Sequence, residues 1–197
     1  VVLPLVLLFA ALLWFEGGSP FFLQARVGKG GKIFSMLKLR TMVPDAEARL
    51  AHLLALDPEL RAEWETTQKL RHDPRVTRLG ALLRQTSLDE LPQLWNVLRG
   101  DISFIGPRPP LRQYVERFPE IYAKVLESRP GISGLASIYF HAHEEYLLAN
   151  AASREETDAI YARACIPRKA RLDLIYQERR NVCMDVSLML KSVIKRL

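Results

Sequence analysis

Apolar residues recur at helical spacing over most of the chain, and this pattern predicts a mostly helical α+β fold. One or two amphipathic helices are expected within residues 45–70, broken near Asp57-Pro58, because proline suits the first position of a helix. A short helix over 76–85 delivers Arg84 just before an acidic pair. The remaining expected elements are helices over 111–128 and 182–197 and a short extended segment over 132–140.

A β-hairpin is predicted near the N-terminus. Residues 21–27 and 32–42 flank the glycine-rich sequence Gly28-Lys29-Gly30-Gly31, which is typical of a hairpin turn. The turn lacks the Gly-Lys-Ser/Thr ending of a phosphate-binding loop. Because alternate residues of a strand point the same way, the second strand presents Lys38 and Arg40 on one face.

A further helix is predicted from an apolar stripe with spacings of three and four residues. The stripe consists of Leu88, Leu91, Trp95 and Leu98. Ser87 is a good N-cap, and Glu90 three residues later completes a capping box. Gly100 is placed to end the helix, whereas Pro92 removes one backbone hydrogen bond within it.

Two adjacent carboxylates, Asp89 and Glu90, lie in the first turn of this predicted helix. They have two interpretations: Glu90 caps the helix and Asp89 complements its dipole, or the pair forms a reaction centre. Asp89, Gln93 and Asn96 form a polar face opposite the apolar stripe, so Asp89 projects where a ligand can sit. A helix N-terminus favours an anion such as phosphate there.

The first fifteen residues (VVLPLVLLFAALLWF) carry no charge and begin without Met, so we expect the chain to start inside a longer hydrophobic segment. Fifteen helical residues span about 22 Å, less than the roughly 30 Å of a bilayer core. A kink at Pro4 would let such a helix enter and leave the membrane by one face. A re-entrant hairpin, a truncated spanning helix and a buried soluble helix all stay open, and a signal peptide fits poorly.

The net charge of +6 points to an anionic partner: nucleic acid, anionic lipid or a phosphorylated substrate. Cys165 and Cys183 lack metal-ligand spacing, and we interpret them as reduced packing residues. His141 and His143 are two residues apart, unlike the i, i+4 pair of a helical metal site. The helix over 182–197 fits either a membrane interface or a packed core.

Five stretches of the chain form a larger pattern. They are Gln24-x-Arg26-Val27-Gly28-x-x-Gly31, Lys38-x-Arg40-Thr41-Met42, the run from Thr86 to Ser103, Gly106-Pro107-Arg108-Pro109, and Arg129-Pro130-Gly131-Ile132-Ser133-Gly134. Together they resemble the bacterial sugar transferase family, the monotopic phosphoglycosyl transferases that act on polyprenyl phosphate. The resemblance covers most of the chain from Pro4 onward, and the block around Asp89-Glu90 is its most specific part.

The resemblance implies a two-step reaction with Asp89 and Glu90 as catalytic residues. Asp89 would attack the sugar-bearing phosphate of a nucleoside diphosphate sugar, such as a UDP-sugar, and undecaprenyl-type phosphate would then accept the phosphosugar. Mg²⁺ or Mn²⁺ is the implied cofactor, with Asp89 as its ligand. The implied contacts to substrate phosphate or nucleotide are Lys38, Arg40, Arg84 and Arg108, and the implied supporting residues are Gln93 and Asp101. Surface pairing or capping stays an alternative for each of the basic residues.

By the same resemblance, residues 1–16 are the second half of a re-entrant membrane helix kinked at Pro4, and residues 17–197 form a catalytic domain with amphipathic interfacial helices around the site. The implied location is the cytosolic face of the bacterial inner membrane, where the enzyme starts the lipid-linked synthesis of exopolysaccharide, O-antigen or capsule. The segment 138–143 departs from the family pattern, so the sugar stays open. The oligomeric state also stays open, a dimer included.

A non-enzymatic module that binds a membrane surface or nucleic acid through its positive charge is the competing hypothesis. No basic stripe interleaved with aromatic residues and no helix-turn-helix spacing stands out, so we expect no nucleic-acid partner.

Overall fold

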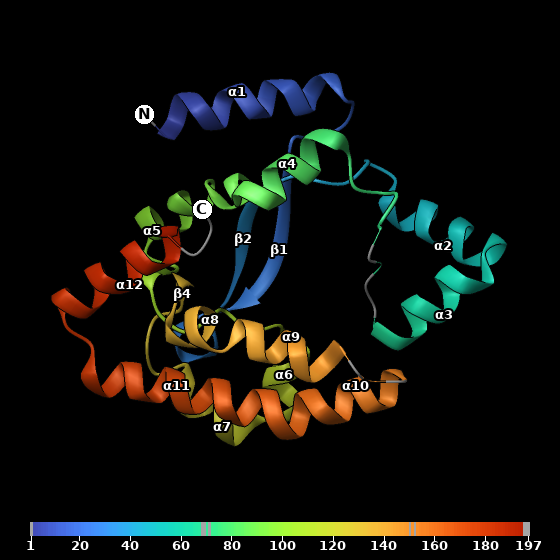
Figure 1. The fold of residues 1–197 in the computed structure, drawn as a ribbon. Coiled ribbons are helices and arrows are strands. Elements are labelled where there is room, and N and C mark those ends of the chain that lie inside the picture. The colour runs from blue at the N-terminus through green and yellow to red at the C-terminus, as the bar shows by residue number, and fades with distance from the viewer. Residues whose placement is uncertain (1, 68–69, 71, 150, 152, 195–197) are drawn as a thin grey trace. The chain divides into compact units, whose positions relative to one another are not determined.

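A computed structural model describes residues 2–67, 70, 72–149, 151 and 153–194, and Figure 1 shows its ribbon. The fold is mostly helical α+β with a β-hairpin, as predicted. The chain divides into two compact units that interleave along the sequence. Unit 1 contains Val1–Phe22, Lys38–Pro92 and Leu147–Ile160, and unit 2 contains Leu23–Leu37, Gln93–Tyr146 and Tyr161–Leu197.

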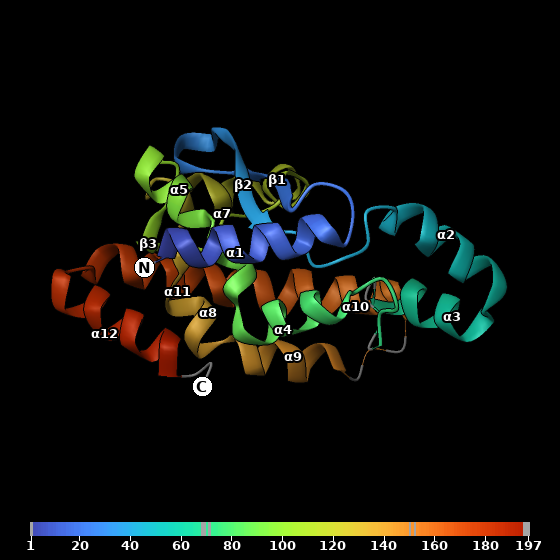
Figure 2. The same ribbon diagram turned by 90° about the horizontal axis from the view of Figure 1, so that it is seen from above.

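Unit 1 is built from helices around a small apolar core. Its main helices are α1 (Val2–Phe15), α2 (Ala46–Leu56), α3 (Pro58–Thr67), α4 (Arg78–Thr86) and α10 (Arg154–Ile160). Helices α2 and α3 lie side by side in Figures 1 and 2. The predicted break between them is confirmed, because Asp57 Oδ1 accepts hydrogen bonds from the backbone of Glu59 and Leu60. The core joins α1 to α4 through Ala10, Leu13, Leu39 and Leu83.

Unit 2 contains a short parallel strand pair, β3 (Ser103–Ile105) and β4 (Gly131–Ser133), with Ser103 opposite Gly131. Helices α6 (Arg112–Arg117) and α7 (Pro119–Val125) make the crossover between these strands. The other helices that contribute to this unit are α5 (Gln93–Arg99), α8 (Leu135–Tyr139), α9 (His141–Ala149), α11 (Ile166–Arg179) and α12 (Val182–Ile194). A π-helix (Tyr161–Cys165) precedes α11. The core gathers Ile105, Ile138, Tyr176 and Leu188.

The hairpin consists of β1 (Phe21–Val27) and β2 (Ile33–Leu39), joined by a 3₁₀ turn (Lys29–Gly31). Gly28 N donates to Lys32 O at 2.7 Å and closes the turn. Gly30 and Gly31 both have positive φ, which explains the glycines of the turn. The predicted hairpin is confirmed.

Close backbone approach explains the glycines around β3 and β4. A Cβ on Gly131 would lie 2.2 Å from Gly106 N, and one on Gly134 would lie 2.1 Å from Gly106 O. No side chain fits at either distance. These glycines therefore let the two strand ends meet beside the loop that carries Arg108.

The helix predicted over residues 88–98 is wrong in its first half. Ser87 has a φ of 55°, makes no side-chain cap, and ends α4 instead. Leu88–Glu90 form a 3₁₀ turn, and α5 begins only at Gln93. Pro92 explains the break, because proline has no N–H to donate to the carbonyl of Leu88 and its ring crowds that carbonyl. The capping box is therefore absent, whereas Gly100, with a φ of 81°, follows the end of α5 as predicted.

The predicted orientation of the apolar stripe on α5 is also wrong. Trp95 and Leu98 are 57% and 80% exposed, whereas Gln93 and Asn96 are each 2% exposed. The polar side chains therefore face inward and the large apolar ones outward. Periodicity identifies the two faces of a helix, but it does not say which face is buried.

Two further predictions need correction. The helix expected over 111–128 is split into α6 and α7, because Phe118 precedes a proline and leaves the helical conformation, with φ −129° and ψ 57°. The extended segment expected over 132–140 contains only β4 and then becomes helix α8, which Ile138 N stabilises by donating to Gly134 O. Cys165 is buried as expected, but Cys183 is exposed and does not pack.

Helix α1 carries its apolar side chains on both the packed and the exposed side. Leu13 is buried in the core of unit 1, whereas Leu3, Leu7 and Trp14 are exposed. Within the described residues, no helix is long and apolar enough to cross a membrane. Pro4 lies in the first turn of α1, where its missing N–H costs no helical bond, so the predicted kink stays a prediction.

Candidate active site in unit 1

The acidic pair lies on the 3₁₀ turn directly after α4, and Lys38 of β2 reaches it. Lys38 Nζ lies 3.1 Å from Glu90 Oε1, and the two side chains are 17% and 11% exposed. A pair this sheltered from solvent is screened less than a surface pair. The structure thus brings together Lys38 and the acidic pair, residues about fifty positions apart in the sequence.

Asp89 is partly buried beside these charges. Burial is the largest cause that raises the pKa of Asp89 above its usual range, and the neighbouring Glu90 raises it further. Lys38 and Arg84 act in the opposite direction and lower this pKa. Asp89 is therefore a more basic carboxylate than an exposed aspartate, held between one acidic and two basic neighbours.

A backbone clamp positions Arg84. Thr77 Oγ1 caps α4 by accepting from Gly80 N at 2.9 Å, and Thr77 N donates to Thr41 O at 3.1 Å. A Cβ on Gly80 would lie only 2.0 Å from Thr41 O, so α4 rests directly on the backbone after β2. At the other end of this contact, Arg84 Nε donates to Thr41 Oγ1 at 2.9 Å. Arg84 is exposed, and the hydrogen bond of its Nε to Thr41 fixes the direction of its guanidinium group.

Arg40 has a different environment from Lys38, although the sequence placed both on one strand face. Its side chain is buried, and its Nη2 donates to Leu13 O at 2.8 Å while its Nη1 donates to Gly17 O. The last carbonyls of a helix lack intrahelical partners, and Arg40 satisfies one of them, Leu13 O, and also binds Gly17 O just beyond the end of α1. These contacts anchor α1, and a phosphate contact of Arg40 stays a prediction.

Gln93, Asp101 and Arg108, three of the predicted site residues, belong to unit 2. Asn96 Oδ1 accepts from Leu37 N at 3.0 Å, and its Nδ2 donates to Ser35 O at 2.9 Å and to Asp101 Oδ2 at 3.0 Å. Asp101 thus supports the side chain that joins α5 to β2. Gln93 is buried, and among the described residues its Nε2 finds no hydrogen-bond partner. Arg108 is exposed in the loop after β3.

Sequence reasoning missed the residues that hold the site together. Thr41, Thr77 and Gly80 form contacts between segments that are 36 to 43 positions apart. Thr41 belongs to the motif Lys38-x-Arg40-Thr41-Met42, but no role was predicted for it. Its place in that motif was the only signal in the sequence that pointed to it.

Asp89 and Glu90 offer two neighbouring carboxylates, the kind of ligand that Mg²⁺ takes from proteins, and a metal ion at this position stays a prediction. Among the residues that the structure describes, no group of three or more His, Cys, Asp or Glu is arranged to hold a metal. Mg²⁺ is usually held by only one or two carboxylates together with substrate phosphates and water. Of these two carboxylates, Glu90 has its Oε1 engaged by Lys38.

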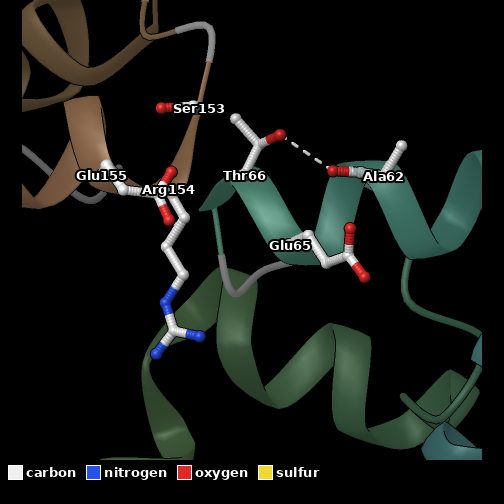
Figure 3. Close-up of a pocket in the computed structure, with 6 residues that line it drawn as sticks. All are labelled: Ala62, Glu65, Thr66, Ser153, Arg154 and Glu155. Carbon is white, nitrogen blue, oxygen red and sulfur yellow. Dashed lines mark hydrogen bonds between the residues drawn. The ribbon is translucent and has the colours of Figure 1, made fainter.

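Figure 3 shows a pocket elsewhere in unit 1, between α3 and the start of α10. Ala62, Glu65 and Thr66 line it on one side, and Ser153, Arg154 and Glu155 on the other. Thr66 Oγ1 donates to Ala62 O, and Thr157 Oγ1 donates to Thr66 O and links the two helices. The pocket contains none of the residues predicted for catalysis.

A comparison with protein families identifies the chain. The model of the family "Bacterial sugar transferase" matches residues 1–197, the whole sequence. The chain belongs to the bacterial sugar transferase family. The predicted resemblance is therefore confirmed, whereas the catalytic roles of Asp89 and Glu90 stay predictions.

Three relatives show the range of bacterial sugar transferases similar to this chain. The UDP-galactose-lipid carrier transferase of Erwinia amylovora is 42% identical over 68% of this chain and 28% of its own length. The undecaprenyl-phosphate galactose phosphotransferase of Salmonella typhimurium is 46% identical over 62% of this chain and 27% of its own length. The exopolysaccharide production protein ExoY of Rhizobium meliloti is 45% identical over 68% of this chain and 60% of its own length. The matched segment thus spans less than two thirds of each of these relatives.

Proposed function

We propose that this sugar transferase moves a sugar 1-phosphate from a nucleoside diphosphate sugar to undecaprenyl phosphate, a step in exopolysaccharide, O-antigen or capsule synthesis. The family match over the whole chain and the names of the relatives support this activity. The observation that carries the proposal is the sheltered carboxylate Asp89 with Lys38 and Arg84 acting on it. A carboxylate nucleophile surrounded by cations suits attack on a phosphoryl group.

In the first step, Asp89 attacks the β-phosphorus of the donor. A bond forms between an Oδ of Asp89 and this phosphorus, and the bond from the phosphorus to the bridging oxygen breaks. The nucleoside monophosphate leaves with that oxygen and its electron pair, and the sugar phosphate stays on Asp89 as an acyl phosphate. The raised pKa of Asp89 favours this attack, because a more basic carboxylate is a stronger nucleophile once it has lost its proton.

In the second step, a phosphate oxygen of undecaprenyl phosphate attacks the same phosphorus. The bond to Asp89 breaks, the carboxylate is restored, and the product is undecaprenyl diphosphate sugar. Two displacements of this kind replace one that is more difficult. Both attacks take place at the phosphorus and expel other groups from it, so the bond between the sugar and its phosphate stays intact throughout.

Charge neutralisation is the role we assign to the basic residues of the site. Arg84 has a guanidinium fork that matches phosphate oxygens, and Arg108 offers another in the loop after β3. Lys38 keeps Glu90 in place through its 3.1 Å contact and lowers the pKa of Asp89. Asp89 would hold Mg²⁺ together with the donor diphosphate, and the ion would supply neutralisation of the diphosphate charge.

Membrane association is proposed for α1, because the acceptor is a lipid. The exposed apolar residues of α1 include Leu3, Leu7, Trp14 and Phe15, and the helix carries no charge. Contact of such a surface with lipid hydrocarbon is more favourable than its contact with water. A location at the cytosolic face of the inner membrane, as a re-entrant helix requires, is part of the proposal.

A transfer assay tests the function. The purified chain is mixed with labelled UDP-sugars, Mg²⁺ and vesicles that contain undecaprenyl phosphate, and label in the lipid fraction is counted. We expect label from at least one donor, a loss of more than a thousandfold in Asp89→Asn, and a loss of about a hundredfold in Glu90→Gln. Arg112→Gln, which changes an exposed residue of unit 2, is the matched control and should keep full activity. Unchanged transfer in Asp89→Asn would refute the assignment of Asp89.

A further inference from the structure

The end of β2 joins helix α1 to the candidate site of unit 1. Lys38 reaches Glu90 of the acidic turn, and Thr41 accepts a hydrogen bond from Arg84. Arg40 lies between Lys38 and Thr41 in the sequence, but it binds the end of α1 instead. Within four consecutive positions, the chain therefore contacts both α1 and the charged side chains of the site.

The environment of Arg40 favours a structural contact over a contact with substrate. Arg40 is only 9% exposed, so a phosphate group that arrives from solvent has little access to it. Its Nη2 donates to Leu13 O at 2.8 Å, and its Nη1 donates to Gly17 O. The C-terminal end of a helix carries a partial negative charge, which stabilises a cation there. Both terminal nitrogens of Arg40 thus bind α1 and the loop that follows it.

The packing around Arg40 links the position of α1 to that of Thr41. Helix α1 lies beside α4 in Figures 1 and 2, and Leu39 is buried in the core that these two helices share. Thr41 is in close backbone contact with α4, where a Cβ on Gly80 would lie 2.0 Å from Thr41 O. A close-packed interior transmits a shift instead of absorbing it. Loss of the Arg40 contacts should therefore displace Thr41 and, with it, the bond to Arg84.

We propose that Arg40 is a positioning residue of the site, which holds the end of α1 and, through Thr41, sets the direction of Arg84. The proposal rests on the proposed function, in which Arg84 neutralises phosphate charge. Arg40 itself touches neither the donor nor the acceptor. Sugar transfer therefore requires α1 to be packed against the end of β2, in addition to any contact of its exposed face with lipid.

Gly18 allows Arg40 to be displaced without changing any group of the site. A Cβ on Gly18 would lie 2.8 Å from Arg40 Nη1 and 2.9 Å from Pro44 Cγ, so Gly18→Ala forces the guanidinium away from α1. Gly17→Ala is the matched control, because a Cβ on Gly17 would meet none of the described atoms within 4 Å. Both glycines have positive φ, so alanine causes backbone strain at either position, but only Gly18→Ala moves Arg40.

The kinetics of sugar transfer by the full chain give the first measurement, at a temperature at which circular dichroism shows each variant to be folded. Gly18→Ala and Arg40→Met should each lower kcat at least about tenfold and change the KM for the donor by less than about twofold, because phosphate charge is neutralised mainly in the transition state. Gly17→Ala should keep kcat within about twofold of the original. Arg40→Lys retains a cation for one of the two carbonyls, so it should recover at least about threefold of the kcat lost in Arg40→Met.

Combination with Arg84→Gln separates positioning from direct contact with phosphate. Residues that act through one another lose their effects together, whereas independent contacts have additive effects on the logarithm of kcat. In a chain that already carries Arg84→Gln, Arg40→Met and Gly18→Ala should therefore lower kcat by no more than about twofold further. A larger further loss, or a raised KM with unchanged kcat in Arg40→Met, would overturn the proposal.

Hydrogen exchange of the backbone amides gives a second measurement, which needs no substrate. Thr77 N donates to Thr41 O at 3.1 Å, so exchange at Thr77 reports the contact between α4 and the end of β2. It should become at least about fivefold faster in Gly18→Ala and Arg40→Met and stay unchanged in Gly17→Ala. Unchanged exchange in both of the first two variants would overturn the proposal. A chain that transfers no sugar would count against the proposed function alone, since the exchange rates still test whether Arg40 positions Thr41.

Discussion

Gly80 lies at the contact between α4 and the backbone of Thr41, where the structure leaves no room for a side chain. A Cβ at this position would stand 2.0 Å from Thr41 O, 2.6 Å from Thr41 C and 2.8 Å from Thr41 Cα. Ordinary contacts of a Cβ are 3.4–4 Å long, so Gly80→Ala requires the two backbones to separate by more than 1 Å. Neither backbone can move alone, because Thr77 N and Arg84 Nε both bind Thr41.

The expected sign of Gly80→Ala is opposite to that of helix propensity. Alanine is better than glycine in a helix by up to about 1 kcal/mol. Forcing a methyl group into a packed site costs about 1–3 kcal/mol, and loosening the two hydrogen bonds to Thr41 costs about 1 kcal/mol each. The net effect is a loss of roughly 2–4 kcal/mol in the free energy of unfolding, by these same terms. For a chain of this size, this loss lowers Tm by at least about 4 °C.

Thermal unfolding of the purified chain in detergent, followed by circular dichroism, measures this change. Gln85→Ala on the exposed side of the same helix is the control, and its Tm should stay within about 1 °C of the original. Because the clamp also directs Arg84, we expect Gly80→Ala to reduce sugar transfer at temperatures where it is still folded. An equal or higher Tm for Gly80→Ala would refute the packing of α4 on Thr41.

Three further substitutions have outcomes that follow from the structure. Lys38→Met removes the cation 3.1 Å from Glu90 and raises the pKa of Asp89, so the acidic limb of the profile of transfer rate against pH should move to higher pH. An unchanged limb would contradict the effect of Lys38 on the pKa of Asp89. Burial raises the pKa of Asp173 from 3.8 to about 7, so the folded protein holds this proton more tightly than the unfolded chain. The free energy of unfolding should therefore fall by up to about 4 kcal/mol as pH rises from 4 to 7, and Asp173→Asn should remove this dependence. Parallel curves of Tm against pH for the two proteins would contradict this. Tyr176→Phe removes the hydroxyl that donates to Asp185 Oδ1 at 2.7 Å, and denaturant unfolding should show a loss of about 1–3 kcal/mol; a change below 0.5 kcal/mol would contradict the contact.

The fold followed from the sequence where a local signal determines it. The hairpin turn is specified by its glycines, and the break between α2 and α3 by Asp57-Pro58, which caps one helix after ending another. Pro92 and Pro119 are signals of the same kind. Pro92 lies directly before α5 and Pro119 is the first residue of α7, so the predicted helices over 88–98 and 111–128 are both divided.

The orientation of α5 could not be predicted, because it depends on a partner far away in the sequence. An apolar stripe usually faces the core, and Leu88 does pack beside the core of unit 1. Asn96 decides the outcome on α5 through its hydrogen bonds to the backbone of Ser35 and Leu37. Nothing in the residues near Asn96 signals those bonds.

The sequence names candidate site residues, whose catalytic roles stay predictions, but it does not give their geometry. The motif identified Asp89, Glu90 and Lys38, and the structure adds the ion pair that joins the last two. It also gives Arg40 contacts to the end of α1 that the alternation of strand residues does not foresee. Long-range contacts of this kind depend on tertiary packing, which a single sequence does not reveal.

Covalent capture of the sugar phosphate on Asp89 is the most direct test of the proposed mechanism. The full chain is incubated with Mg²⁺ and a panel of UDP-sugars without acceptor, and the mass of the intact protein is measured. With a donor that supports transfer, we predict a gain equal to one sugar phosphate on the peptide that contains Asp89, and its removal when undecaprenyl phosphate is added. Asp89→Asn should show no gain. Transfer to lipid without any adduct, or an adduct that persists in Asp89→Asn, would contradict the account.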